Sequence, residues 1–338
     1  MRLILIKIYK ALIYFPATTA LALLLCIVPF EILAQPHARD YPSKPVKLVI
    51  PYVAGGGIDI IARTIAQKMS TQTGHKFIVE NRGGAGGSIG TDFVAKSLPD
   101  GYTILVTSSA HASLPSIMNN LNYDPIQDFS PITLVARSVG LILVVHPSLP
   151  VSSVKELIAL TKANPGLYRY GSGGTGSVTH FAAESFNFMA GTEIKHVPYK
   201  GLGQAIVDCL AGHIEVCFVA ATAGKPHIKS DKLRALGLTG LVRWGELPNV
   251  PTIEEAGLKN YSYPIWYAFL FPANTPSEYS EKMRNEINLA LEDSETKRIF
   301  SEQGLIPVFS TSQELNKIIK DDIELHKKLV NRIGLEKQ

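Results

Sequence analysis

Apolar runs typical of buried strands alternate along this chain with amphipathic runs of helical period, and this alternation limits the possible folds most strongly. Residues 46–52, 77–81 and 102–106 are rich in the apolar and β-branched side chains of buried strands. Between the first two, residues 58–69 place apolar side chains at helical spacing, which predicts a helix packed on a sheet. Strands that alternate with helices form α/β domains. We therefore expect α/β architecture with largely parallel pairing.

A second set of strands and helices follows a break in the pattern at residues 128–137. The sequence predicts strands at 141–145, 167–170, 193–199, 214–219 and 233–238, and helices at 178–190 and 202–211. An extended aromatic segment at 261–271 and charged amphipathic helices at about 277–303 and 313–333 come after them. Two successive α/β sets predict two domains.

Residues 1–34 are predicted to be a secretory signal sequence. Three basic residues precede a long apolar run from residue 11 to residue 30, and cleavage is expected after Ala34. A retained membrane anchor is the alternative, because the run is long enough to span a bilayer. No later stretch is long and apolar enough to do so.

The chain left after cleavage is close to neutral. Removing residues 1–34 takes away three basic residues and one acidic residue, which lowers the formal charge from +4 to +2. Nucleic acid is therefore not an expected partner, because it requires a basic surface. Cys209 and Cys217 remain; both lie in apolar patterns, and buried thiols are favoured over a disulfide.

Two glycine-rich stretches match motifs of enzymes, but each lacks the context that its motif needs. Residues 171–176 match the Gly-x-Gly-x-x-Gly dinucleotide fingerprint, yet the next strand ends in Tyr199 and Lys200 where an acidic residue is required. Residues 86–90 match the Gly-x-Ser-x-Gly nucleophile elbow, yet six residues separate Ser88 from the preceding strand. An exported α/β hydrolase that uses Ser88 stays as the alternative function.

No other cofactor or metal motif stands out in the sequence. A phosphate-binding loop is missing, and the nine histidines show no ligand-like spacing. We predict neither a cofactor nor a metal.

Glycine loops at helix starts suit a different role, the binding of an anion. The start of a helix presents unpaired backbone N–H groups and a partial positive charge, and glycine lets a carboxylate approach them closely. Gly55–Gly57 and Gly171–Ser177 each follow a predicted strand and precede a predicted helix. Either loop alone is well explained as a tight turn, but two of them favour a shared cleft.

Several side chains near these loops have alternative interpretations. Asp59 is expected to cap its helix, because a carboxylate at an anion site would repel the ligand. Lys200 is either a positive charge for the site or a solvated lysine. Trp266 and Tyr267 are expected in the core, with lining of the cleft as the alternative.

Five motifs in order resemble those of the periplasmic substrate-binding proteins of the tripartite tricarboxylate transporter group, also called the Bug family. They are PYVAGGGID at 51–59, NRGGAGGSIG at 81–90, PDGYT at 99–103, YGSGGTGS at 170–177 and HVPYKG at 196–201. The resemblance covers nearly all of the chain after the predicted signal. It implies a two-domain periplasmic-binding-protein fold of type II character, whose interdomain cleft closes on a small organic carboxylate.

The resemblance also implies positions for the ligand-binding residues. Together with the reasoning above, it gives as predicted site residues Val53, Ala54, Gly55, Gly56, Gly57, Asp59, Ser108, Ser109, Gly171, Ser172, Thr175, Gly176, Ser177 and Lys200.

The predicted organisation follows from these points. Residues 35–137 and 264–338 form the first domain and residues 138–263 the second. The protein is expected in the periplasm, as a monomer and not an enzyme, where it delivers its ligand to a membrane permease or a sensor. The sequence leaves the identity of the acid open.

Overall fold

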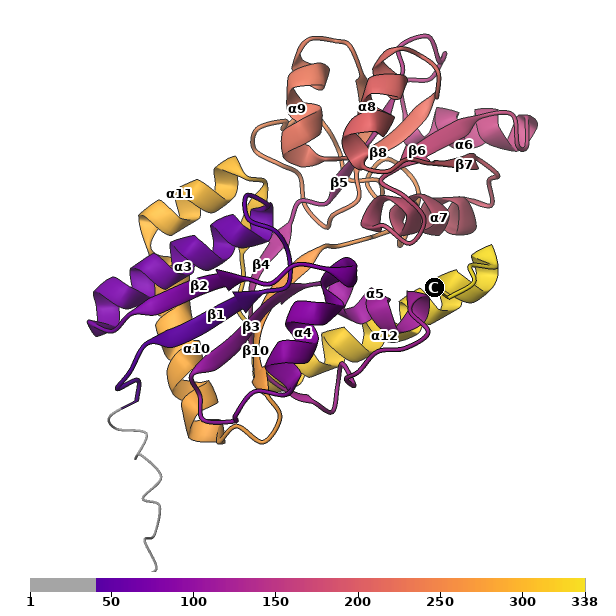
Figure 1. Ribbon diagram of the computed structural model, residues 1–338. Helices are drawn as coiled ribbons and strands as arrows, with labels where there is room; N and C mark the ends of the chain where they lie inside the picture. The colour runs from indigo at the N-terminus through magenta and orange to yellow at the C-terminus, as the bar shows by residue number, and fades with distance from the viewer. Residues whose placement is uncertain (1–40, 338) are drawn as a thin grey trace, which may run out of the picture. The chain divides into compact units, whose positions relative to one another are not determined.

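Two β-sheets, each with helices on both faces, make up the described chain (Figure 1). The computed structural model describes residues 41–337. The predicted signal sequence, residues 1–34, lies outside the described residues. The protein has a mixed α/β fold, as the sequence predicts.

The first sheet has six strands in the order β11-β4-β10-β3-β1-β2. Side chains alternate between its two faces. In β10, Trp266 and Leu270 belong to one buried cluster, whereas Phe269 and Phe271 are buried on the opposite face. The strands are β1 (Val46–Ile50), β2 (Phe77–Asn81), β3 (Thr103–Ser108), β4 (Phe129–Ser138), β10 (Trp266–Pro272) and β11 (Leu305–Pro307).

Helices cover both faces of the first sheet (Figure 1). The Trp266 cluster takes in side chains of three helices, α4 (Ser88–Ala95), α5 (Ala110–Ile117) and α12 (Ser312–Ile333). A short 3-10 helix, η3 (Ala85–Gly87), precedes α4. The other helices are α3 (Gly57–Thr73), α10 (Ser277–Glu292) and α11 (Ser294–Glu302), and α3 contacts both α10 and α11.

The second sheet has five strands in the order β7-β6-β8-β5-β9. Leu143 of β5 packs in a core with α6 (Val154–Ala163) and α7 (Val178–Ala190). Val144 packs on the other face with α8 (Leu202–Leu210), next to α9 (Ala221–Lys229). The strands are β5 (Leu141–Val145), β6 (Arg169–Ser172), β7 (Lys195–Pro198), β8 (Val216–Ala220) and β9 (Arg234–Leu238).

The expectation of largely parallel pairing is wrong. Among the described strand pairs, four are parallel and five are antiparallel. Parallel neighbours need a crossover within one sheet. β5 and β10 instead receive the chain directly from the other sheet, and both run antiparallel to their neighbours.

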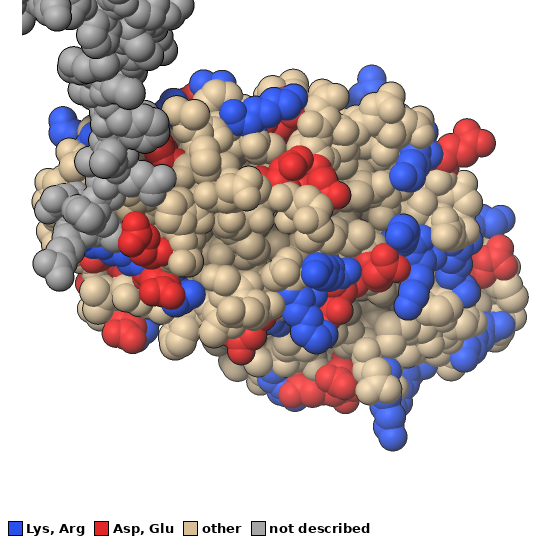
Figure 2. Space-filling view, turned by 90° about the horizontal axis from the view of Figure 1, so that it is seen from below, with Lys and Arg blue, Asp and Glu red and all other residues tan. Residues whose placement is uncertain are grey.

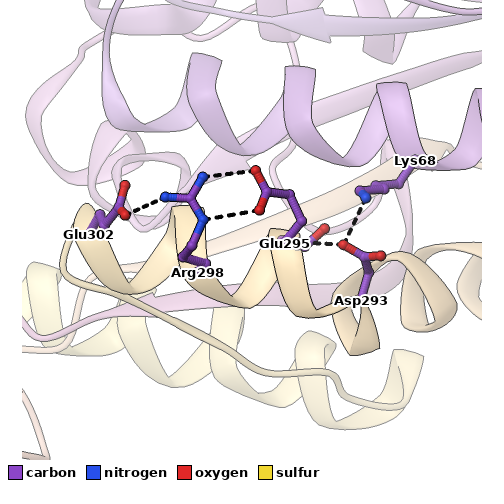
Figure 3. Close-up of polar contacts among 6 residues, drawn as sticks. Lys68, Asp293, Glu295, Arg298 and Glu302 are labelled. Atoms are coloured by element: carbon purple, nitrogen blue, oxygen red, sulfur yellow. Dashed lines mark hydrogen bonds and ion pairs between the residues drawn. The ribbon is translucent and has the colours of Figure 1, made fainter.

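The helix predicted at 277–303 is two helices that meet at Asp293. The backbone of Asp293 is extended, with φ −61° and ψ 134°. The Asp293 carboxylate accepts a hydrogen bond from the N–H of Thr296, so Asp293 caps α11. Lys68 of α3 forms an ion pair with Asp293 at 2.8 Å, and Arg298 pairs with Glu295 and Glu302 (Figure 3). Exposed pairs of this kind add little stability individually. The Lys68–Asp293 pair nevertheless joins α3 to the start of α11, whereas the two Arg298 pairs lie within α11.

Three of the described α-helices, α5, α6 and α9, were not predicted from the sequence. α5 contains Pro115, and α9 contains Gly224 and Pro226. Proline and glycine lower helix propensity and mask the apolar period. Tertiary packing against β3 and β8 overrides that preference.

The chain passes between the sheets at two adjacent places. One is the link from Ser138 to Leu141, and the other is the segment between β9 and β10. The two are tied together, because the N–H of Ser138 donates to the carbonyl of Ile265 at 2.8 Å and the N–H of Thr239 donates to the carbonyl of Leu141 at 2.8 Å. The domain boundaries given above stay a prediction.

Helix α12 contributes to the cores of both sheets. Leu315 and Ile319 lie in the Trp266 cluster, whereas Leu329 and Val330 lie in the core of α6 and α7. Near its middle, His326 Nε2 is 2.9 Å from the hydroxyl of Tyr263. One continuous helix therefore packs with both halves of the fold.

The surface and the cysteines agree with the low net charge and apolar patterns of the sequence. Figure 2 shows basic and acidic side chains interspersed over the face in view. Within residues 41–337, no helix is long and apolar enough to cross a membrane. Cys209 and Cys217 are both buried and free, so the prediction of buried thiols, favoured over a disulfide, is confirmed.

We predict that Gly140→Ala destabilises the link between the sheets. Gly140 has φ +92°, and a Cβ there would lie 2.4 Å from the backbone nitrogen of Gly240. We expect a loss of about 1–3 kcal/mol of unfolding free energy in urea. Gly203→Ala is the control, because a Cβ at Gly203 meets nothing within 4 Å. Equal stability of the two variants would contradict the prediction.

Candidate functional site

The first glycine loop connects β1 to α3 and leaves the start of that helix uncapped. Gly55 has φ +94°, a conformation that favours glycine, and Gly56 is the N-cap residue. Among the described residues, none caps α3 with its side chain. The first N–H groups of a helix have no partner within it. Donors at Gly56 and Gly57 are thus available to a ligand.

Asp59 fixes the conformation of this loop through hydrogen bonds. Its buried carboxylate accepts hydrogen bonds from the N–H of Gly55 at 3.2 Å, from Arg63 at 2.9 Å and from Asn81 at 3.0 Å. The Arg63 guanidinium, with help from Asn81 and Gly55, holds the pKa of Asp59 below its ordinary value of 3.8. The predicted capping role is wrong, because the carboxylate reaches Gly55, which precedes the helix. Its charge is offset by Arg63, so it does not face a bound anion unpaired.

A group of hydroxyls lies beside the same loop at the ends of β1, β3 and β10. Tyr267 stands opposite Ser108 in the sheet, and its hydroxyl is 3.8 Å from where a Cβ on Gly57 would lie. Tyr52 hydrogen-bonds to Ser108. Burial raises the pKa of Tyr267 to about 12, so this tyrosine stays a neutral donor. Trp266 is in the core as predicted, whereas Tyr267 lies at the loop.

Tyr52 is a candidate site residue that sequence reasoning missed. The available signal was its position two residues after the end of β1, where the first loop begins. Ser109, which was predicted, is 6% exposed, and its N–H donates to the carbonyl of Trp266 at 3.0 Å. Its side chain is therefore less accessible than that of Ser108, which is half-buried.

The second glycine loop uses many of its own amides. The N–H of Gly173 donates to Thr179 Oγ1 at 2.9 Å, that of Gly174 to Ser172 Oγ at 3.1 Å, and that of Gly176 to His180 Nδ1 at 3.0 Å. These bonds fix the loop, but they leave fewer donors for a ligand than the sequence suggests.

Two of the predicted residues in this loop have evident packing roles. Gly171 lies inside β6, where a Cβ would lie 2.4 Å from Ile214 Cδ1. Ser172 is fully buried, and its hydroxyl is 2.6 Å from His196 Nε2. Ser177 instead caps α7, where its hydroxyl accepts from the N–H of His180 at 3.3 Å.

A stacked pair of histidine rings contacts the second glycine loop. The rings of His180 and His196 are 4.0 Å apart, and Tyr170 stacks on His196 at 5.0 Å. Burial lowers the pKa of both histidines to about 4. Both rings are therefore neutral at pH 7, which lets His180 Nδ1 accept the Gly176 N–H.

Lys200 is exposed on the segment that packs against this loop. A Cβ on Gly174 would lie 3.1 Å from the carbonyl oxygen of Tyr199. Lys200 thus follows directly after a residue in contact with the loop, and its ammonium group is solvated.

A cavity of about 480 Å³ brings parts of the two halves together. It is lined by Ala85, Gly86, Leu114, Ile117, Met118, Thr175, Gly176, Ser177, Leu335 and Glu336. Of the predicted site residues, Thr175, Gly176 and Ser177 line it, whereas those of the first loop do not. A larger hollow of about 770 Å³ beside Lys44 and Phe93 includes none of the predicted residues.

The first loop is nevertheless close to this cavity. A Cβ on Gly87 would lie 3.1 Å from the ring of Tyr52. Gly86, next in the chain, lines the cavity. Gly84, Gly86 and Gly87 all have positive φ, which allows the loop before α4 to turn tightly here.

The comparison with known families decides what kind of protein carries this arrangement. The model described as tripartite tricarboxylate transporter family receptor matches residues 61–335. The chain belongs to this family.

Relatives of this receptor include curated and solved proteins. The protein BugT of Bordetella pertussis is 35% identical over 306 residues, which are 89% of this chain and 93% of BugT. The solved periplasmic binding protein BugD is 31% identical, with a TM-score of 0.71 over 88% of this chain and all of BugD. A protein of R. palustris solved with adipate is 31% identical, with a TM-score of 0.73. The match covers 88% of this chain and the whole of the R. palustris protein.

Membership decides between receptor and enzyme. The family and its solved relatives are binding receptors, and the chain is not an enzyme. Ser88 agrees with this assignment, since it begins α4 after η3 and does not follow a strand directly. The hydrolase alternative is therefore set aside. Among residues 41–337, no cluster of three or more His, Cys, Asp or Glu side chains is arranged to hold a metal ion.

We predict that Asp59→Asn destabilises the receptor at pH 7 by about 1–3 kcal/mol, because the Arg63 charge loses its partner. The pKa of Asp59 is lower in the folded state, so its contribution is complete above 3.8 and is lost as the pH falls through the folded value. The difference between wild type and variant in the free energy of unfolding, measured in urea, should therefore shrink below about pH 4.

The control for this experiment is Asp321→Asn. Asp321 forms an exposed pair with Lys317, and such pairs contribute little. A stability difference for Asp59→Asn that matches this control, or that grows in acid, would contradict the role assigned to Asp59. Subtracting the unfolding free energy of the variant from that of the wild type also removes the acid sensitivity of the buried histidines, which both proteins share.

Proposed function

We propose that this protein is a periplasmic capture receptor that closes around a small organic carboxylate. The single observation that carries the proposal is the uncapped start of α3, with glycines at Gly55–Gly57 and the hydroxyls of Tyr52, Ser108 and Tyr267 beside it. Neutral donors of this kind suit a carboxylate. The adipate found with the R. palustris relative supports this ligand class.

The proposed binding residues come from both halves of the fold. The first set is Val53 through Gly57 with Ser108 and Ser109, to which we add Tyr52 and Tyr267. The second set is Thr175, Gly176 and Ser177 at the start of α7, with Lys200 nearby, while Asp59, Gly171 and Ser172 support the loops. A carboxylate at the α3 start would accept from amides and hydroxyls at once.

Closure is proposed to occur about the two links between the sheets. Residues 35–137 with 264–338 would move against residues 138–263, and ligand would favour the closed form by contacting both glycine loops. Hinges need few chain crossings, and the links at Ser138–Leu141 and before β10 are adjacent and hydrogen-bonded.

Membership of the family supports a role in delivery. We propose that the chain is exported by its first 34 residues, acts in the periplasm as a monomer, and presents its closed form to the membrane subunits of a tripartite tricarboxylate transporter, or to a sensor. Family receptors work with membrane subunits of this type.

We predict that Gly56→Val abolishes ligand binding and leaves the fold intact. Gly56 has φ −83°, which valine adopts readily, and a Cβ there meets nothing within 4 Å. The branched side chain would instead occupy the space beside the α3 amides. The measurement is the melting temperature against a panel of organic acids, since saturating ligand at about 100 times Kd stabilises by about 2.7 kcal/mol.

Gly245→Val serves as the control, because a Cβ at Gly245 also meets nothing within 4 Å. Both variants should melt like the wild type without ligand, and only Gly245→Val should keep the ligand-dependent rise. A full rise in Gly56→Val would place the ligand elsewhere. If native mass spectrometry and the panel reveal no bound acid in the wild type, the proposed function is wrong.

A further inference from the structure

The 480 Å³ cavity contains features that narrow the class of ligand. Its volume lies in the range of about 300–1,000 Å³ that small-molecule pockets occupy. It joins the start of α7 on one side to the end of α5 on the other. The chemical character of the lining residues therefore limits which acid can bind in the cavity.

Most of the wall is apolar. Leu114, Ile117 and Met118 supply it from α5 and the residue after it, and Leu335 supplies it from the segment after α12. Ile117 also approaches the second glycine loop, since a Cβ on Gly176 would lie 3.5 Å from its side chain. Such a wall favours an apolar group over a hydroxylated one, because a polar group buried there would lose its hydrogen bonds to water.

The wall formed after α12 is held in place on α5. Lys337 Nζ donates to the carbonyl of Pro115 at 2.9 Å, and the side chain of Asn119 donates to the carbonyl of Lys337 at 3.1 Å. The N–H of Leu335 donates to the carbonyl of Val330 at 3.2 Å. These bonds position Leu335 and Glu336 as part of the cavity.

One side of the cavity is polar. Thr175, Gly176 and Ser177 line it just before α7, and Thr175 and Ser177 each carry a hydroxyl. The carboxylate itself is proposed to bind at the start of α3, and Tyr52 of that loop lies against Gly87, next to the cavity residue Gly86. The apolar wall on α5 adjoins the polar side at Ile117.

The charge of the side chains that line the cavity also limits the class of ligand. Among the described residues that line it, Glu336 alone carries a charge, and that charge is negative. No lysine or arginine among these lining residues is present to receive a second carboxylate. A dicarboxylate whose far end reaches Glu336 would meet repulsion.

We propose that the ligand is an organic acid with one carboxylate and an apolar body, and that the body occupies the cavity between α5 and Leu335. This inference rests on the proposed function and specifies its ligand class. It excludes hydroxylated tricarboxylates as the preferred ligands of this chain.

The experiment measures Kd by calorimetry on the purified chain for hexanoate, adipate, acetate and citrate. Hexanoate and adipate share six carbons and differ by one carboxylate, while acetate lacks the apolar body. Hexanoate should bind tightest, about a hundredfold more tightly than acetate because four further carbons are buried. Adipate should bind about fivefold more weakly than hexanoate.

Two variants test the walls separately. Ile117→Ser should weaken hexanoate about tenfold and leave acetate unchanged, because it removes apolar contact from the cavity. Ile78→Ser is the matched control, since Ile78 is 50% exposed on β2, away from the cavity. Glu336→Gln should improve adipate about fivefold, with hexanoate unaffected. Glu336 is exposed, so this variant should fold normally.

The outcomes distinguish this inference from the proposed function. Tighter binding of adipate or citrate than of hexanoate, or a hexanoate affinity that neither variant at the cavity changes, overturns the inference while the carboxylate receptor stands. Binding of none of the four acids counts against the inference and, if the wider panel also fails, against the function. Hexanoate binding that depends on Ile117, with adipate improved by Glu336→Gln, establishes the ligand class.

Discussion

The start of α3 can hold an anion only if its amides stay unpaired while the loop around them stays fixed, and the hydrogen bonds of Asp59 meet both conditions. The carboxylate accepts hydrogen bonds from the N–H of Gly55, the guanidinium of Arg63 and the amide of Asn81, and none of these donors is the N–H of Gly56 or Gly57. A capping side chain at Gly56 would have fixed the loop by using up the donors. Because glycine stands there and the fixing group lies further along the helix, the amides remain for the ligand.

The two glycine loops differ in this respect. The second loop donates three of its N–H groups to Thr179, Ser172 and His180, and buried neutral histidines support it. It is therefore the more rigid side and contributes fewer donors, while its neighbour α5 supplies apolar surface. A ligand held by amides and hydroxyls on the first half and by apolar contact near the second would use both, and only the closed form would offer both together.

Much of this structure follows from local sequence patterns. The strands at 77–81 and 141–145 and the helix at 178–190 have the bounds that periodicity predicts, because each carries an uninterrupted apolar pattern. What depends on contacts distant in sequence was not predictable: the antiparallel pairing of β10 and the proline-containing helices. The break at Asp293 is a local N-cap, which the sequence analysis did not identify. For the site, glycines and helix starts were visible in the sequence. The partners of Asp59, the hydroxyl of Tyr52 beside Ser108, and the approach of residues 335–336 to α5 arise only when the chain folds.

The most direct test of the account is an NMR titration of the protein labelled with [15N]glycine, in which the amide signals of Gly56 and Gly57 are followed as organic acids are added. A carboxylate that accepts hydrogen bonds from these amides must move their proton signals downfield in a saturable way. The account predicts such shifts at Gly56 and Gly57, with the signal of Gly245 unchanged. Saturable binding of an acid that leaves both of these signals in place would contradict it.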